Sequence, residues 1–320
     1  MTVASPLTLV AFALPAGMAA DHPDQAHWQQ ALNTAFASTD SYLWRQAQRV
    51  TTTTLPDSAM SACHEAAWAQ ALGWVIKDGQ VPLAAFAAAT LGLHCPTEHG
   101  WAFIDAVHWQ ISQGQVNLSV PTPITAYESE ALGEAMQPFL TQDGIHLHPY
   151  SPGRWLAHAS VFKHLSSVSL DRVNGQRIDH WLQPSSIATQ TDAERLLRRL
   201  QNEMQMLFYT HAVNDHRAVA LNSIWFSGTG QLPTVNPHTV KRDIVMHQGL
   251  REAWLSQNPE VFVPAFTAVW QDTLAPALAR HEQVLLCDPT RSVLLGNAPQ
   301  GLRGKLQQWL RPPKLSDLLQ

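Results

Sequence analysis

The chain has 320 residues, of which 45% are hydrophobic and 14% are charged, and its formal net charge is −5 at pH 7. This length and hydrophobic content suffice for one large or two modest globular domains, and they exclude an intrinsically disordered protein. Because the net charge is negative and no run of Lys or Arg occurs, we expect no nucleic-acid partner.

The N-terminal segment MTVASPLTLVAFALPAGMAA has an apolar centre and an Ala-rich end. A signal peptide has a similar centre, but no Lys or Arg precedes the apolar run here. The favoured interpretation is therefore a first buried strand over residues 7–14, ended by Pro15 and Gly17. Since no window of about 18 uninterrupted apolar residues occurs, we also expect no association with a membrane.

The first half of the chain continues with a helical pattern over residues 23–50 and two Ala-rich helices, in HEAAWAQALGWVI and PLAAFAAATLGL. The segment GWAFIDAVHWQISQGQVNLS then predicts a β-hairpin that turns at Gln113-Gly114-Gln115. The spacing from Thr125 to Glu128 is a capping box, which predicts a helix that ends near Pro138.

The second half begins with GIHLHPYSPGRWLAHASVF, which predicts another hairpin around a Ser-Pro-Gly turn. A capping box from Thr191 to Glu194 opens an amphipathic helix. Its apolar face carries Leu196, Leu200, Met204, Leu207, Phe208 and His211. A strand is expected in AVALNSIWF, and two late strands are expected in HEQVLLCD and SVLLG. The alternation of strands and helices predicts an α/β fold, with a mixed sheet core flanked by helices.

The sequence contains no G-x-S-x-G, G-x-x-x-x-G-K-[ST] or H-E-x-x-H motif. His146 and His148 alternate along a predicted strand with His158 on its partner, so a three-nitrogen metal site is conceivable from spacing. No carboxylate or cysteine accompanies them, and Cys95, His99 and His108 fit no zinc spacing. We therefore favour structural or surface histidines and expect no metal and no cofactor.

Other residues allow two interpretations each. Three cysteines, Cys63, Cys95 and Cys287, lack C-x-x-C spacing and favour a reducing compartment, so cytoplasmic localisation is expected. The 12 tryptophans are spread along the chain, as in core packing rather than a ligand cage. Glu203 lies at the edge of the apolar helix face, which favours an ion pair with an arginine such as Arg217 over a general base of raised pKa.

A resemblance is carried by GRWLAHASVF, IDHWLQP and LLRRLQNEMQMLFYTHAVNDHRAVALNSIWFSGTGQLP. These segments resemble the insert domain of archaeal-type cofactor-independent phosphoglycerate mutases, members of the alkaline phosphatase superfamily. The family has an Arg-bearing hairpin, a helix, a His-Pro-x-Asn-x-x-Arg turn and a strand that runs from Ala-Asn into Gly-x-Gly. The matching positions here are Arg154, His211, Asn214, Arg217, Leu221, Asn222, Gly228 and Gly230.

The whole chain is also similar to the RpfE-type regulatory proteins, whose features NEMQML and LNSxWxxGxG occur here, as does their D-x-V-H feature at Asp105, Val107 and His108. The resemblance implies an α/β core of residues 1–120 and 231–320 and an insert-like α+β subdomain of residues 121–230. The catalytic mutases need two metal ions and a serine nucleophile, but the first strand here ends in ALPAG without an acid, and no Asp-His-Gly segment follows the late strands.

The resemblance therefore implies a regulatory or ligand-binding protein without two-metal mutase chemistry, and it leaves open whether the chain is an enzyme. The expected ligand is a small phosphorylated or carboxylated metabolite, and the candidate ligand-binding residues are Arg154, Glu203, His211, Asn214, Arg217 and Asn222. Structural locking is the favoured role of His211, Asn214 and Arg217, with guanidinium recognition by Arg154 and Arg217 as the alternative. Two further functions stay open, an active mutase or phosphatase-like enzyme with a rearranged site and a protein-interaction scaffold.

Overall fold

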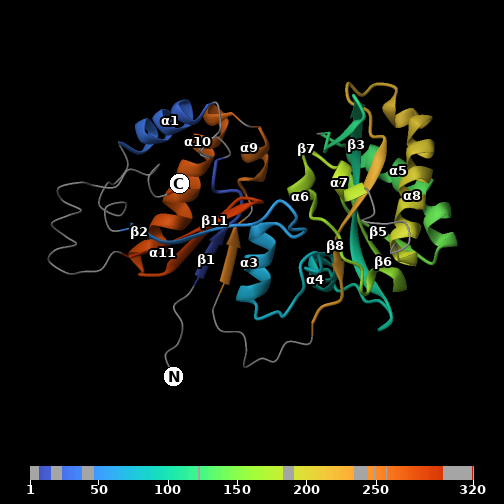
Figure 1. Cartoon of the computed structure of the whole chain (residues 1–320), viewed down its shortest axis with the longest axis horizontal. Helices are drawn as coiled ribbons and strands as arrows, with labels where there is room; N and C mark the ends of the chain where they lie inside the picture. Colours follow the sequence, from blue (N-terminus) through green and yellow to red (C-terminus); the bar gives the residue numbers. More distant parts are fainter. Residues whose placement is uncertain are drawn as a thin grey trace. The chain divides into compact units, whose positions relative to one another are not determined.

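The computed structural model describes residues 7–15, 24–37, 47–121, 123–182, 191–233, 244–247, 249–256, 258–297 and 319. The chain divides into two compact units, each with its own sheet (Figure 1). Unit 1 comprises Met1–Asp57, Ala62–Val75 and Val235–Gln320, and unit 2 comprises Ser58–Ser61 and Ile76–Thr234. The predicted α/β class is confirmed.

Unit 1 is built on a mixed five-stranded sheet of order β2-β11-β10-β1-β9. β1 pairs in parallel with β9 and β10, whereas β11 is antiparallel to both β10 and β2. Its described elements are β1 (Leu7–Val10), α1 (Gln25–Ala37), β2 (Ala47–Thr54), α3 (Cys63–Ala71), β9 (Ile244–His247), α9 (Arg251–Leu255), α10 (Pro259–Val269), the π-helical turn η5 (Trp270–Leu274), α11 (Ala275–Ala279), β10 (Gln283–Cys287) and β11 (Arg291–Asn297).

Two predictions at the start of unit 1 need correction. The first strand ends at Val10 rather than Leu14, because Phe12 adopts a left-handed backbone with φ of 58°, which cannot continue a strand. The helical pattern of residues 23–50 also extends too far, since β2 begins at Ala47 and pairs with β11. Position 17, where a strand stop was predicted, lies outside the described residues.

Unit 2 is an α+β unit whose named strands all pair antiparallel. The sheet has the order β5-β6-β3-β4-β7, and β8 pairs with β3 off this path. Its described elements are α4 (Leu83–Thr90), β3 (Gly100–Ser112), β4 (Gln115–Ser119), α5 (Ala126–Gln142), β5 (His146–Ser151), β6 (Arg154–Ala159), η2 (Ser160–Phe162), α6 (Leu170–Val173), β7 (Gln176–Arg177), α7 (Asp179–Leu182), α8 (Asp192–Tyr209), η4 (Ala212–Asn214) and β8 (Ser223–Gly230).

Both predicted hairpins of unit 2 are confirmed, and each turns where the backbone needs positive φ. Gln113 and Gly114, with φ of 51° and 76°, connect β3 to β4, as a two-residue turn between twisted strands requires. In the β5–β6 hairpin the turn position is Gly153, with φ of 77°. A side chain at Gly153 would be strained by this positive φ, and its Cβ would also lie 2.4 Å from Ile124 Cδ1, so glycine is favoured there.

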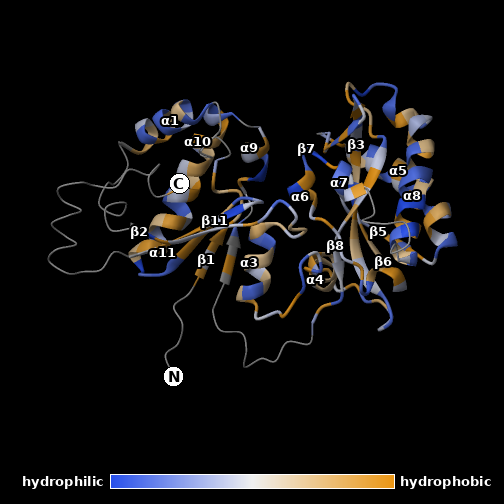
Figure 2. Cartoon of the chain, in the orientation of Figure 1, coloured by the Kyte–Doolittle hydropathy of each residue, from blue (hydrophilic) through white to orange (hydrophobic). Residues whose placement is uncertain are grey.

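Helices cover both faces of the unit 2 sheet. α5 and α8 pack on one face, where Ala102, Ile104 and Ala157 join their buried residues in one core, and α4 packs on the other face against Trp101 and Phe103. Figure 2 shows the hydrophilic residues of α8 as a blue stripe along the helix.

Both capping boxes are present, with Thr125 and Thr191 each accepting from the backbone of the glutamate three residues later. The predicted end of α5 near Pro138 is wrong. The helix continues through Pro138 to Gln142. Proline has no N–H to donate to the carbonyl of Glu134, but both residues lie on the exposed side of the helix, where water can satisfy that carbonyl.

The boundary between the units differs from the expected core and insert. Residues 76–120, which the resemblance assigned to the core, lie in unit 2 because β3 pairs with β6 and β8. Among the described residues, no helix is both long and apolar enough to cross a membrane.

Candidate functional site

The polar segment between α8 and β8, residues 211–222, forms a hydrogen-bonded turn that we call the α8–β8 junction. His211 Nδ1 accepts from the backbone N–H of Val213 at 3.2 Å and so begins the short η4 turn. The Asn214 amide donates to the carbonyls of Phe208 and Leu221 at 2.8 and 2.9 Å, and its oxygen accepts from Leu221 N at 2.8 Å. Asn214 thereby joins the end of α8 to the start of β8.

Arg217 is fully engaged within the same junction. Its Nη1 lies 2.8 Å from Glu128 Oε1 and 3.1 Å from the Pro123 carbonyl. Its Nη2 and Nε reach the carbonyls of Pro121 and Val219 at 3.4 and 3.2 Å. Burial opposes ionisation of Glu128, but the Thr125 backbone N–H and Arg217 outweigh it and lower the pKa of this carboxyl. Arg217 therefore holds the N-terminus of α5 to the junction.

Asn222 extends the pairing of β8 with β3 by means of its side chain. Its oxygen accepts from Trp109 N at 2.7 Å, its amide donates to the Trp109 carbonyl at 2.9 Å, and its own N–H donates to the Val107 carbonyl at 3.0 Å. The Asn222 side chain thus takes the place of a backbone residue in the ladder.

Glu203 has a different partner from the one expected. Arg217 pairs with Glu128, and the carboxylate of Glu203 instead lies 3.9 Å from Arg199 Nε, one helical turn earlier on α8. The Glu203 side chain is 33% exposed, and this spacing is an ordinary surface pair on a helix.

Arg154, the first residue of β6, has fewer protein partners than Arg217. Its Nε donates to Asp105 Oδ1 at 2.5 Å, and its guanidinium carbon lies 4.7 Å from the centre of the Phe103 ring. Burial opposes the charged form of Arg154, but Asp105 outweighs it and raises the pKa of Arg154, and Asp171 and Tyr150 act in the same direction. Within the described part of the chain, neither Nη atom of Arg154 has a protein hydrogen-bond partner.

The imidazoles of His99, His146, His148 and His158 gather on the same face of the sheet as Arg154. The rings of His146 and His148 stack on His158 with centroids 4.7 and 5.3 Å away, and His99 Nδ1 lies 3.0 Å from His158 Nδ1. Burial, followed by the charges of the neighbouring imidazoles, lowers the pKa of His158 to about 4.

These rings stack rather than converge on a point. No three of the four bring ligand nitrogens within 4.8 Å of one another, and a metal ion lies in the plane of an imidazole that binds it. The cluster, which we call the imidazole stack, therefore packs beside Trp101, with ring centroids 5.0 Å apart for His158 and 5.5 Å for His148.

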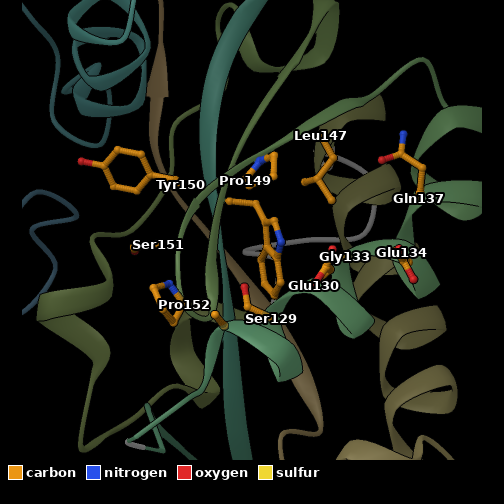
Figure 3. Close-up of a pocket in the computed structure, with 12 residues that line it drawn as sticks. Ser129, Glu130, Gly133, Glu134, Gln137, Leu147, Pro149, Tyr150, Ser151 and Pro152 are labelled. Carbon is orange, nitrogen blue, oxygen red and sulfur yellow. The ribbon is translucent and has the colours of Figure 1, made fainter.

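A cavity of about 540 Å³ lies between α5 and the β5–β6 hairpin on the opposite face. Figure 3 shows Leu147 and Pro149 on the strand side, and Ser129, Glu130, Glu134 and Gln137 along the helix. Gly133 and Trp155 both line the cavity, and a Cβ at Gly133 would lie 2.9 Å from Trp155 Nε1. With an apolar floor and carboxylates at its rim, this cavity suits a neutral or cationic group rather than an anion.

A pair of thiols in unit 1 was missed by sequence reasoning. Cys63 is the first residue of α3, Cys287 is the last residue of β10, and their side chains hydrogen-bond to each other. That hydrogen bond, with a second from Ser292, outweighs burial and lowers the pKa of Cys63 to about 7, whereas the pKa of Cys287 is raised. The sequence does place Cys63 directly before a predicted helix and Cys287 near the end of a predicted strand. Without C-x-x-C spacing, however, nothing in the sequence indicates that the two thiols lie close together.

The thiols lie at the carboxyl ends of the parallel strands of unit 1. Open α/β sheets bind their ligands at this edge. β1 ends there at Val10, and two residues later Phe12 has a left-handed backbone, which is uncommon for a bulky residue and is typical of functional positions. The Phe12 ring lies 4.8 Å from the His64 ring, and the Arg251 guanidinium lies 5.9 Å from it.

Two solved structures are similar to this chain at low sequence identity. No protein-family model matches the chain, and no curated protein matches it. A solved structure described as the cofactor-independent phosphoglycerate mutase from Thermoplasma acidophilum DSM 1728 is 13% identical, covers 93% of this chain and 90% of its own, and has a TM-score of 0.34. The PH0037 protein from Pyrococcus horikoshii is 10% identical, covers 96% and 93%, and has a TM-score of 0.43. At these scores neither likeness assigns a role to a residue.

Proposed function

We propose that the protein is a phosphoglycerate-mutase-like ligand-binding protein with a regulatory role, which recognises a small phosphorylated or carboxylated metabolite without two-metal phosphoryl transfer. The observation that carries the proposal is the guanidinium of Arg154, which is held at Nε by Asp105 and over the Phe103 ring, with both Nη groups free of protein partners in the described residues.

This arrangement suits a planar acceptor. Two parallel N–H donors match the two oxygens of a carboxylate or a phosphate, and a guanidinium that is already oriented loses little side-chain entropy on binding. The proposed ligand set centres on Arg154, with Tyr150 as its near neighbour. Arg217, His211, Asn214 and Asn222 leave the proposed ligand set, because their polar groups hold the junction together.

The charge around Arg154 also constrains the ligand. Asp105 and Asp171 both favour the protonated guanidinium, so an incoming anion must bind in their field. We therefore expect the affinity to be modest and to depend on the bidentate geometry more than on net attraction. This expectation fits a protein that responds to changing metabolite levels, with the cytoplasm as its expected compartment.

The proposal is tested by isothermal titration of metal-stripped protein with 3-phosphoglycerate. Saturable heat is expected for the wild type, and binding at least about tenfold weaker is expected for the double variant Asp105→Asn, Arg154→Met. This double variant leaves no buried carboxylate unpaired at the site. The control is Arg195→Met, which removes an exposed arginine whose partner is Asp192 on the surface of α8.

Two outcomes oppose the proposal. Equal binding by the double variant would remove Arg154 from the site, and no heat with the wild type would remove this ligand class. Turnover of phosphoglycerate that depends on added Mn²⁺ or Zn²⁺ would instead establish the enzymatic alternative.

The second candidate function is a protein-interaction module, and the cavity beside α5 favours it. Its apolar floor and the carboxylates of Glu130 and Glu134 would accept a basic, apolar segment of a partner protein. A Glu130→Gln, Glu134→Gln variant is expected to lose such a partner while it retains the binding of 3-phosphoglycerate. Retention of the partner by this variant would exclude the cavity as its docking site.

A further inference from the structure

The two thiols of unit 1 are arranged as an unequal pair. Cys63 N donates to the Pro289 carbonyl at 2.9 Å, so the start of α3 is fixed to the turn that follows Cys287. Both residues are free cysteines, and their side chains are in hydrogen-bond contact. Cys63 is 5% exposed and Cys287 is fully buried, so Cys63 is the more accessible thiol of the pair.

The surroundings make Cys63 the nucleophile of the pair. Its thiolate accepts hydrogen bonds from Cys287 and Ser292 and lies at the first turn of α3, where free backbone N–H groups favour a negative charge. His64 acts in the same direction, whereas Asp288 opposes the thiolate. Cys287 stays protonated, because it donates to Cys63 and is buried.

We propose that Cys63 and Cys287 form a reversible oxidation site that responds to hydroperoxides. The Cys63 thiolate attacks one oxygen of the hydroperoxide and the O–O bond breaks, which leaves Cys63 as a sulfenic acid and releases water or an alcohol. Cys287 then loses its proton and attacks the Cys63 sulfur, the S–O bond breaks, water leaves, and a disulfide forms.

In sum, two thiols and one hydroperoxide give a disulfide, one water and one water or alcohol, and the protein loses two electrons. A dithiol reductant reverses the reaction. The disulfide would connect the start of α3 to the end of β10, at the carboxyl edge of the unit 1 sheet. This site is independent of the Arg154 site, so the two proposals fail separately.

The full chain is treated with a stoichiometric amount of hydrogen peroxide, alkylated, digested and analysed by mass spectrometry. We expect a cross-linked peptide pair that contains Cys63 and Cys287 and is two hydrogen atoms lighter than the two reduced peptides, and dithiothreitol should restore the free thiols. Cys95 serves as the internal control, because burial raises the pKa of its thiol and it should stay reduced. Oxidation of Cys95 first, or sulfenic acid at Cys63 without the disulfide, would overturn the proposal.

Two variants separate the roles of the thiols. Cys287→Ser is expected to stop at the sulfenic acid, which dimedone traps, and Cys63→Ser is expected to react at least about tenfold more slowly with peroxide. If either variant fails to fold, the pH dependence of the rate at which iodoacetamide labels Cys63 in the wild type tests the proposal instead. This rate should show an inflection near pH 7, and a single inflection above pH 8.5 would contradict the proposal.

Discussion

The α8–β8 junction and the face that carries Arg154 use the same residue types for opposite purposes. At the junction, Arg217 contacts Glu128 and three backbone carbonyls, and Asn214 makes three hydrogen bonds. On the sheet face, Arg154 has one carboxylate partner and a ring beneath it. The difference teaches that two arginines singled out by one motif can differ in the donors that remain free, and the proposal of a ligand site at Arg154 rests on that difference.

The largest expected effect comes from removing the junction arginine. Arg217→Met leaves the Glu128 carboxylate, whose side chain is 16% exposed, without its cation and leaves three carbonyls without their donor. We expect the free energy of unfolding from urea denaturation to fall by about 3 kcal/mol. The control Arg195→Met should change it by less than about 0.5 kcal/mol, and a similarly small effect at Arg217 would remove the distinction between the two regions.

The imidazole stack makes the Arg154 face sensitive to acid. The pKa of His158 is about 4 in the folded protein and 6.5 when unperturbed, so the unfolded chain binds the proton first as the pH falls. We therefore expect stability to be complete well above pH 6.5 and to be lost progressively toward pH 4, with a loss of about 2.5 kcal/mol by pH 4.5. Urea denaturation between pH 7.5 and 4.5 measures this loss.

A His158→Gln variant gives the matched comparison for this pH dependence. It should flatten the curve over the same interval, whereas the Arg217→Met variant should keep the slope of the wild type. An unchanged slope in His158→Gln would assign the acid sensitivity to other groups.

A smaller effect is expected at Asn222, which makes two side-chain hydrogen bonds to the Trp109 backbone. Asn222→Ala leaves one N–H and one carbonyl of β3 unpaired and should lower the free energy of unfolding by about 1 to 2 kcal/mol. Binding of 3-phosphoglycerate should stay unchanged in this variant. Weaker binding with unchanged stability would return Asn222 to the ligand set.

The smallest effect is expected at Glu203. Its pair with Arg199 at 3.9 Å is partly exposed, so Glu203→Gln should change the free energy of unfolding by less than about 0.5 kcal/mol. Ligand binding should also be unaffected. A bell-shaped pH dependence of any activity, abolished by this variant, would support the general-base interpretation that was set aside.

The sequence predicts local elements well where the signal is local. The capping boxes at Thr125 and Thr191 and the turn at Gln113-Gly114 place helices and a hairpin correctly, because each depends on residues within a few positions of one another. The end of β1 was misplaced, because the backbone at Phe12 turns left-handed inside an apolar run and gives no sign of it in the residue pattern.

The candidate sites depend on contacts that no local pattern contains. Arg154 and Asp105 are 49 positions apart, and the sequence singled out both without pairing them. Arg217 and Glu128 are 89 positions apart, so the expected partner of Arg217 was instead the nearby Glu203. Cys63 and Cys287 meet only because α3 starts beside the β10–β11 turn. In each case the chemistry of a residue was set by a distant strand or helix.

The most direct test of the Arg154 site is isothermal titration of the Arg154→Lys variant with 3-phosphoglycerate, beside the wild type and Arg195→Lys. The lysine keeps the positive charge opposite Asp105 but lacks the two parallel donors. We expect Arg154→Lys to weaken binding about tenfold or more and Arg195→Lys to bind as the wild type does. Equal affinity for all three proteins would contradict recognition by the guanidinium fork of Arg154.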